Sequence, residues 1–361
     1  MPFESVRLFS FRNLADAEVL VSAERVFLVG ENGQGKTNFL EALYYLSYGT
    51  SFRGPVDAEV AQRGSSGFSL SGTVRDEKDS LPPEEIRISW EGRVKDIRRS
   101  GKSVHDRKEL VALNPAVVFC HEDYAFASGE PERRRFFFDQ SAGLVSPGYI
   151  DLLRDYKRVL KQRNAALKDR REELVSLLDI QLAGFGIRLR EERTKLETEF
   201  NERFALRYEA VSLLGTEVKV RYRPSWSEEL DIEEILEKIA SKRAEELALG
   251  TSLSGPHRDR WSFSYAGGDF AATASTGQLR LLSLTLRMVQ AEYYRSATGR
   301  LPVLLLDDVL LELDRGKRRR FLELLPLSAQ AFFTFLPGES WEDYKTESTL
   351  VYEVRDGRFE D

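Results

Sequence analysis

The chain contains Gly30-Glu31-Asn32-Gly33-Gln34-Gly35-Lys36-Thr37, which fits the pattern G-x-x-x-x-G-K-[ST] at every specified position. An apolar run at 25–29 precedes it and predicts a buried strand, and apolar residues recur at helical spacing over 38–46. A strand, a glycine-rich loop and a helix in this order are the context in which the pattern binds phosphate. An ordinary glycine-rich turn is the alternative, and the flanking strand and helix argue against it.

The residue types of this loop suit a nucleoside triphosphate with Mg²⁺. Gly30, Gly33 and Gly35 let the backbone turn so that successive N–H groups point at phosphate oxygens. The helix that begins here turns its positive end toward the same anion. Lys36 adds a charge for the β- and γ-phosphates, and Thr37 offers a hydroxyl to Mg²⁺.

Length and composition limit the class of protein. A chain of 361 residues can hold two domains, or one large domain with an insertion. Its 42% hydrophobic and 31% charged residues are typical of a soluble globular protein. The sequence has no apolar run of about 18 residues and no signal peptide at its start. The single cysteine, Cys120, excludes an internal disulfide. We expect a cytoplasmic protein without a membrane segment.

The order of predicted elements indicates an α/β head interrupted by a helical domain. Strands are predicted at 3–10, 17–21, 25–29 and 116–120, and an antiparallel sheet at 68–74, 85–90 and 94–98. Later strands are predicted at 218–222, 301–306 and 332–335, with a hairpin that turns at Gly267-Gly268. We therefore predict a head formed by residues 1–125 and 251–361 and a helical domain at 126–250.

The helical domain is predicted to contain a short antiparallel arm. Apolar residues recur at three- to four-residue steps on one face of two stretches, 153–167 and 182–204. A turn near 177–180 would bring the two helices side by side. Further helices are predicted at 231–249, ending at Gly250, and at 279–294.

An apolar strand at 301–306 ends in two carboxylates, Asp307 and Asp308. Asp307 is suited to hold Mg²⁺ together with Thr37 or through water. Asp308 is predicted to point to the other side of the strand, where it can orient an attacking water. The alternative is that Asp308 only caps the following turn. We predict Asp308 and Lys36 as the catalytic residues.

Ser275-Thr276-Gly277-Gln278 lies at the start of an apolar helix. The N–H groups of a helix start form an anion site, although an ordinary N-cap would have the same residue types. With the phosphate loop and the acidic strand, this element resembles the signature of the ATP-binding-cassette ATPases, which is of the Ser-x-Gly-Gln type and precedes the acidic strand.

The chain resembles one family more closely, the RecF family of DNA-repair ATPases. The matching stretches follow one another in the same order as in that family, from about residue 3 to 335. Many families share the phosphate loop, whereas Arg163-Asn164-Ala165-Ala166-Leu167-Lys168 and Gly255-Pro256-His257-Arg258-Asp259 are much more specific. The other matching stretches are Gly30–Asn38, Ser51–Arg53, Glu130–Arg135, Ser275–Gln278 and Leu304–Asp314.

The resemblance implies an α/β fold: an ABC-type, SMC-like ATPase head with a mainly helical second domain and a short antiparallel helical arm. It also implies an ATP-dependent homodimer, in which the signature of one subunit closes on the γ-phosphate bound by the other. The residues it implies for ATP are Gly30, Glu31, Asn32, Gly33, Gln34, Gly35, Lys36, Thr37, Asn38, Ser275, Gly277 and Gln278, with Thr37 and Asp307 for Mg²⁺.

The resemblance further implies binding to double-stranded and gapped DNA, including single-strand/duplex junctions. It implies partnership with RecR, help in loading RecA at gaps, a place in DNA replication, repair and the SOS response, and weak DNA-stimulated ATP hydrolysis. Asp307-Asp308 stands where most cassette ATPases have Asp-Glu; this agrees with RecF proteins and suits slow hydrolysis. No histidine follows Thr334, so a switch histidine there is absent or replaced by Thr334.

Basic residues for DNA gather in one part of an acidic chain. The net charge is −6, but residues 126–171 hold eleven Lys/Arg against six Asp/Glu, and local patches matter more for nucleic-acid contact than the total. The predicted DNA-binding residues are Arg133, Arg134, Arg135, Lys157, Arg158, Lys161 and Arg163. The alternative for each is a solvated helix face with i,i+4 pairs. His257 is interpreted as a core or turn histidine.

Three classes of function remain open at this point. The favoured one is an ATP-switched DNA-binding dimer of recombinational repair. The second is another SMC-like ATPase or the ATPase subunit of a membrane transporter, and the third is a clamp in which ATP is only a structural ligand.

Overall fold

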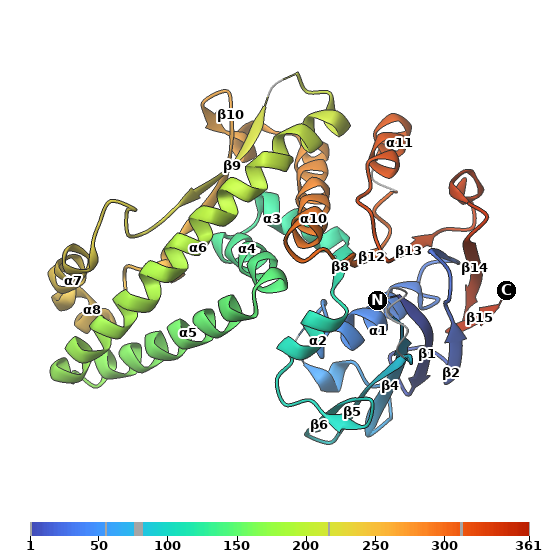
Figure 1. Cartoon of the computed structure of the whole chain (residues 1–361), viewed down its shortest axis with the longest axis horizontal. Helices are drawn as coiled ribbons and strands as arrows, with labels where there is room; N and C mark the ends of the chain where they lie inside the picture. Colours follow the sequence, from blue (N-terminus) through green and yellow to red (C-terminus); the bar gives the residue numbers. More distant parts are fainter. Residues whose placement is uncertain (1, 55, 76–81, 216, 311–312, 361) are drawn as a thin grey trace. The chain divides into compact units, whose positions relative to one another are not determined.

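The computed structural model describes residues 2–54, 56–75, 82–215, 217–310 and 313–360, and the chain forms two compact units. One unit comprises Met1–Glu122 with Gln290–Asp361, and the other comprises Asp123–Val289 (Figure 1). The head domain was predicted to end at residue 125 and to resume at residue 251. The first of these boundaries is close to the observed one, whereas the first unit resumes only at Gln290. The reason is that β10 (Arg260–Tyr265) pairs antiparallel with β9 (Val218–Arg223), which keeps the chain after residue 250 within the helical unit.

The central sheet of the first unit has the strand order β15-β14-β3-β13-β12-β8. Its strands are β3 (Arg25–Val29), β8 (Ala116–Phe119), β12 (Val303–Leu306), β13 (Gln330–Phe335), β14 (Thr349–Arg355) and β15 (Arg358–Glu360). All neighbours pair in parallel except β14 and β15. β8, β12 and β13 are buried at every residue, as expected for strands covered on both faces. The segments that follow β3 and β12 therefore emerge at one edge of this sheet.

A second, antiparallel sheet of the same unit has the order β2-β1-β4-β5-β6-β7. Its strands are β1 (Phe3–Phe9), β2 (Ala17–Leu20), β4 (Gly67–Val74), β5 (Glu84–Glu91), β6 (Val94–Arg99) and β7 (Lys102–Ser103). Helix α1 (Lys36–Tyr48) contacts β4 and β5 of this sheet and β8 and β13 of the central sheet. Because α1 lies between two sheets, nearly all its residues are buried.

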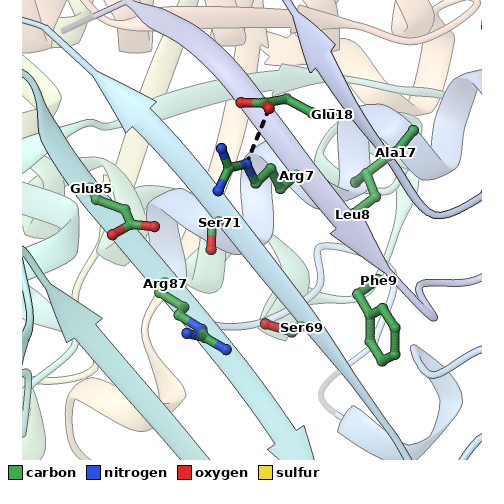
Figure 2. A pocket seen from close by; sticks show the side chains of 9 residues that line it. All are labelled: Arg7, Leu8, Phe9, Ala17, Glu18, Ser69, Ser71, Glu85 and Arg87. Carbon is green, nitrogen blue, oxygen red and sulfur yellow. Dashed lines mark ion pairs between the residues drawn. The ribbon is translucent and has the colours of Figure 1, made fainter.

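The outer face of the antiparallel sheet carries side chains of mixed character. Figure 2 shows Arg7, Glu18, Ser69, Ser71 and Arg87 on neighbouring strands, with an Arg7–Glu18 ion pair of 3.2 Å. Phe9 on the same face is 57% exposed. Opposite charges therefore lie beside each other here.

The second unit is built on two long helices, α5 (Pro147–Lys168) and α6 (Glu172–Ser212), which pack side by side (Figure 1). The sequence placed the turn at 177–180, and this prediction is wrong. The chain turns at 169–171, where Arg170 has a left-handed φ of 54°, and Leu177 lies exposed within α6. Residues 177–180 continue the helix α6 without a break. The local sequence at 177–180 therefore gave no true turn signal.

Around the arm lie a small sheet of order β11-β10-β9, with β11 at Gly268–Asp269, and shorter helices. The helix predicted at 231–249 is two helices, α7 (Ile232–Ser241) and α8 (Arg243–Leu249), and Gly250 caps the second in a left-handed conformation. The hairpin turns at Ala266-Gly267, one residue before the predicted pair. The remaining helices are α2 (Lys108–Leu113), α3 (Tyr124–Ser128), α4 (Pro131–Val145), α9 (Phe270–Thr273), α10 (Thr276–Thr298) and α11 (Arg315–Glu323).

None of the helices in the described ranges is long and apolar enough to cross a membrane. Of the stretch Leu304–Asp314, residues Leu311 and Glu312 lie outside the described residues.

Candidate functional site

The phosphate loop connects β3 to α1 through residues 30–35, as predicted. At two positions the fold requires glycine. A Cβ on Gly30 would lie 2.4 Å from the carbonyl oxygen of Val354 in β14. Gly35, the residue before α1, has φ 117°, which strongly disfavours any side chain. The loop backbone is thus fixed close to its neighbours, with the start of α1 directed into the loop.

Lys36 is buried, with only 4% of its surface exposed, and its ammonium turns back onto the loop. Nζ donates to the carbonyl oxygens of Gly30 at 2.5 Å and Glu31 at 3.0 Å. Burial lowers the pKa of Lys36, and the nearby carboxylates of Asp308 and Asp307 oppose this effect. A cation held at the loop by neutral carbonyls is suited to exchange them for phosphate oxygens.

Thr37 and Asp307 meet at the edge of the central sheet. The Thr37 hydroxyl donates to Oδ1 of Asp307 at 2.8 Å, although 270 positions separate the two residues in sequence. Burial raises the pKa of Asp307 to about 6, and the adjacent Asp308 carboxylate adds to this, while the Thr37 hydrogen bond opposes it. A buried carboxylate whose pKa is raised in this way is stabilised by a cation beside it.

Asp308 is the second residue after β12, and it does not point away from Asp307, contrary to the prediction. Its φ is 50°, so the alternation of side chains along a strand does not extend to it. Its N–H donates to Thr334 Oγ1 at 2.8 Å, and that hydroxyl lies 2.9 Å from Asp308 Oδ1 and 3.3 Å from Asp307 Oδ1. Thr334, at the position considered for a switch histidine, therefore bridges the two carboxylates.

Polar side chains from several segments brace the phosphate loop. Asn13 Nδ2 donates to the Gly33 carbonyl at 2.8 Å, Asn38 Nδ2 to Asn13 Oδ1 at 2.6 Å, and Arg53 to Asn38 Oδ1 at 2.9 Å. The turn between β14 and β15 adds two bonds to Gln34, from Asp356 N at 2.6 Å and from Gly357 N at 2.9 Å. The family-like matches Gly30–Asn38 and Ser51–Arg53 gave a signal for Asn38 and Arg53. The contacts of Asn13 and of the β14–β15 turn depend on segments distant in sequence, and no pattern pointed to them.

Ser275–Gln278 forms a reciprocal cap at the start of α10. Ser275 N donates to Gln278 Oε1 at 2.8 Å, and Gln278 N lies 3.3 Å from Ser275 Oγ. Gly277 has no positive φ, and a Cβ on it would meet no atom within 4 Å. Neither backbone conformation nor packing within the chain explains a glycine at this exposed position. The stretch lies in the second unit, whereas the phosphate loop lies in the first.

The predicted DNA-binding residues fall into three groups: four are exposed, two are half-buried and Arg163 is fully buried. Arg133, Lys157, Arg158 and Lys161 are exposed on α4 and α5, with Arg158 also 2.9 Å from Asp155. Arg134 and Arg135 are half-buried and donate to backbone: Arg134 to the carbonyls of Phe126, Ala127 and Trp261, and Arg135 to that of Asp259. Their guanidinium groups mainly hold the unit together.

Arg163 is a correction to the predicted interface, because it is completely buried. Its guanidinium donates to Asp179 at 2.6 Å, to Glu246 at 2.7 Å and to Ser252 at 2.7 Å. These partners join α5, α6, α8 and the segment after α8. The sequence showed a basic residue on a basic helix, and only the packed structure reveals that two carboxylates enclose it.

The Gly255–Asp259 stretch is a second buried junction. Asp259 accepts from Arg193 at 2.7 Å, from Ser225 N at 2.8 Å and from the Tyr222 hydroxyl at 2.5 Å. His257 Nδ1 lies 2.7 Å from the Tyr156 hydroxyl, and burial lowers the pKa of His257 to about 4. Neutral His257 thus occupies a structural position, as its interpretation as a core or turn residue requires.

The fold and the loop–carboxylate site define an ATPase head of the ABC/SMC-like class. The family model for the "RecF/RecN/SMC N terminal domain" matches residues 3–356. A solved Smc head bound to the C-terminal winged-helix domain of ScpA is similar in fold, with a TM-score of 0.58 at 14% identity over 100% of this chain and 97% of that one.

Within the ABC/SMC-like class of ATPases, relatives with higher identity to this chain are RecF proteins. The DNA replication and repair protein RecF of Treponema pallidum (strain Nichols) is 43% identical over 96% of this chain and 98% of its own length. The RecF of Leptospira interrogans serovar Lai is 30% identical over 97% of each. A solved structure of the recombination mediator protein RecF with ATP matches with a TM-score of 0.89 at 26% identity, over 99% of this chain and 96% of that chain. The chain belongs to the RecF family of DNA replication and repair proteins.

The residues present fit ATP with Mg²⁺. The phosphate loop presents Lys36 and the start of α1, and the Thr37–Asp307 pair offers a hydroxyl and a carboxylate. Protein-bound Mg²⁺ commonly takes one or two carboxylates together with substrate phosphates.

Proposed function

We propose that the protein is an ATP-dependent DNA-binding protein of recombinational repair. It binds duplex and single-strand/duplex junction DNA as an ATP-induced dimer, cooperates with RecR and helps load RecA at gaps. Its ATP hydrolysis is weak and is stimulated by DNA. Membership of the RecF family supports this proposal, as does the likeness to a recombination mediator of the RecFOR pathway.

The observation that carries the ATP-dependent part is the hydrogen bond of 2.8 Å between Thr37 and Asp307. It brings the phosphate loop and the acidic strand to one point. Bound Mg²⁺ would neutralise charge on the phosphate oxygens there, held by Thr37 and Asp307. Lys36 would leave the carbonyls of Gly30 and Glu31 and bind the β- and γ-phosphates.

Asp308 has the role of a base in this proposal. A water attacks the γ-phosphorus, the bond to the β–γ bridging oxygen breaks, and the Asp308 carboxylate accepts the proton of the water. Thr334 holds Oδ1 of Asp308 at 2.9 Å, which limits how far this short side chain can turn. Slow turnover is the expected result.

The dimer places the signature of one subunit on the ATP of the other. Ser275 and Gly277 lie exposed at the start of α10, where a γ-phosphate would meet helix N–H groups. The open space around Gly277 supports this, because close approach by another molecule explains a glycine that the fold itself does not need. The exposed cations of α4 and α5 are the proposed DNA contacts.

The test measures ATP hydrolysis with and without DNA, and binding to duplex or junction DNA with and without ATP. It also measures whether the protein captures the organism's own RecR. We expect DNA affinity that rises with ATP, hydrolysis that rises with DNA, and RecR capture. Hydrolysis indifferent to DNA, without DNA binding, would favour a transporter-type ATPase subunit. DNA binding that needs ATP but shows no turnover at all would favour a clamp in which ATP is only structural.

A further inference from the structure

The two-stranded ribbon β9–β10 has two chemically different faces. Val218, Val220 and Tyr222 of β9 alternate with Lys219, Arg221 and Arg223. The first set is buried, and Phe263 of β10 packs beside Phe204 of α6, with ring centroids 6.3 Å apart. The second set therefore projects from the opposite face, since successive side chains of a strand point to opposite sides.

The residues of β10 on this outward face all carry hydrogen-bond donors. Arg260, Ser262 and Ser264 of β10 lie opposite Arg223, Arg221 and Lys219. We call these six residues the basic ribbon. All six side chains carry N–H or O–H donors, and Arg221, Arg223 and Arg260 are exposed. A hollow lies over part of this face. It is lined by Lys219, Arg221, Arg223 and Ser264, together with Glu217, Tyr222, Tyr265, Ala266 and Gly267.

The charges of the basic ribbon are poorly compensated within the chain. Lys219 has an ion pair with Glu217 at 2.7 Å, and Arg221 donates to Ser264 at 3.2 Å. Arg223 and Arg260 face each other across the ribbon, and among the residues that the structure describes neither has an ion-pair partner. Like charges directly opposite in a sheet are destabilising. The arrangement costs stability in the free protein, and an anion on this face would relieve it.

We propose that the basic ribbon binds the phosphodiester backbone of duplex DNA without reading its sequence. This rests on the proposed DNA-binding function and adds a contact surface that lies outside the exposed cations of α4 and α5. Alternate residues of a strand are about 6.8 Å apart, which is close to two base-pair steps of about 3.4 Å each along the axis of duplex DNA. Arginine and serine are typical donors to phosphate oxygens.

A protein partner fits this face less well. Stable protein interfaces are centred on buried aromatic or aliphatic anchors. Within the described part of the chain, the exposed large apolar side chains lie elsewhere, and none belongs to β9 or β10. The face offers charge and hydroxyl groups at regular spacing, which suits a uniform polyanion.

The experiment compares two triple variants of the full-length protein that remove equal charge. Arg221→Gln, Arg223→Gln and Arg260→Gln change the basic ribbon. Arg7→Gln, Arg75→Gln and Arg98→Gln change three arginines in or directly after strands of the antiparallel sheet. These arginines already pair with Glu18, Glu4 and Asp96 (Figure 2 shows the first pair). Affinity for a labelled duplex is measured with ATP between about 50 and 200 mM salt.

We expect the ribbon variant to lose at least about tenfold in affinity for the duplex at the lower salt concentration. The slope of log affinity against log salt concentration should fall in magnitude by about 2.7, because each of three lost phosphate contacts contributes about 0.9. The control variant should match wild type in both. Thermal unfolding should show the ribbon variant as stable as wild type or more so, because the Arg223–Arg260 repulsion is removed.

Three results would overturn the proposal. If wild type binds duplex and the ribbon variant has the same affinity and slope, the ribbon inference fails while the proposed function stands. Binding to polyglutamate is measured in the same way, and a ribbon variant that keeps its affinity for duplex DNA but loses polyglutamate binding would assign the face to an acidic protein. If wild type does not bind DNA with ATP, the proposed function fails first and the ribbon inference fails with it.

Discussion

Among single residues, Lys36 tests whether the glycine-rich loop is the nucleotide site. Its ammonium is buried and bound to two loop carbonyls. Lys36→Met keeps the length of the side chain and removes the charge. We expect ATP affinity to fall by at least about 100-fold, because charge-assisted hydrogen bonds to two phosphates are lost. Titration with a fluorescent ATP analogue measures this, with Arg87→Gln as a surface control, and near-wild-type affinity in the Met variant would mean that the loop is not the nucleotide site.

Asp308 tests the assignment of the base. Asp308→Asn keeps an oxygen for the Thr334 hydroxyl and leaves Asp307 in place. We expect ATP binding to persist while hydrolysis falls by about 10²–10⁴-fold, since an amide cannot accept the proton of the water. Single-turnover hydrolysis gives the rate, and size-exclusion chromatography with ATP should show dimers accumulating. Unchanged hydrolysis would leave Asp308 with only its structural contact to Thr334.

Arg163 has a structural role that its position on a basic helix conceals. Arg163→Met would leave Asp179 and Glu246 buried without their shared cation. We expect the free energy of unfolding to fall by about 3 kcal/mol, as for other broken buried ion pairs. Urea denaturation measures the loss, and Lys157→Ala, an exposed neighbour on α5, should change stability by less than about 0.5 kcal/mol. Equal stability of the two variants would contradict the buried network.

Among the elements, the segment before β10 contains His257, which makes the free energy of unfolding depend on pH. Burial lowers the pKa of His257 to about 4, below its usual value of 6.5. Between these values the unfolded chain binds a proton that the folded chain does not, so stability rises with pH across this window. At pH 5 the cost is on the order of 1–2 kcal/mol.

The measurement compares wild type with His257→Gln at pH 7.5 and pH 5 by urea denaturation. Wild type should lose more stability on acidification than the variant, since the carboxylates that also titrate are common to both. An equal loss in the two proteins would show that His257 is accessible to protons in the folded state.

The elements also show what local sequence determines. The order strand, glycine loop, helix is contained in residues 25–48, and the apolar strand before Asp307 is equally local, so both were predicted. The position of the arm turn depends on Arg170 rather than on a break in propensity. β14 and β15 were missed although Asp356-Gly357 between them is a typical two-residue hairpin turn, with both residues at positive φ, and this turn holds Gln34. The burial of Arg163 and the Thr334 bridge depend on partners far along the chain, which no local pattern contains.

For the whole molecule, the ATP site that we propose needs two copies of the chain. The phosphate loop belongs to one compact unit and Ser275–Gln278 to the other. The reciprocal cap at Ser275 satisfies part of the helix start within the chain itself. The exposed, sterically open Gly277 remains the stronger argument for contact with a second molecule.

The central claim is that each ATP is shared between subunits. The most direct test mixes Lys36→Met protein with Ser275→Arg protein, each inactive alone and each shown to be folded. In a mixed dimer, one site combines a wild-type loop with a wild-type signature. If shared sites act independently, hydrolysis at equal amounts should recover to about a quarter of the wild-type rate, because half of the dimers are mixed and each holds one intact site of two. No recovery at any mixing ratio would contradict sharing across the dimer.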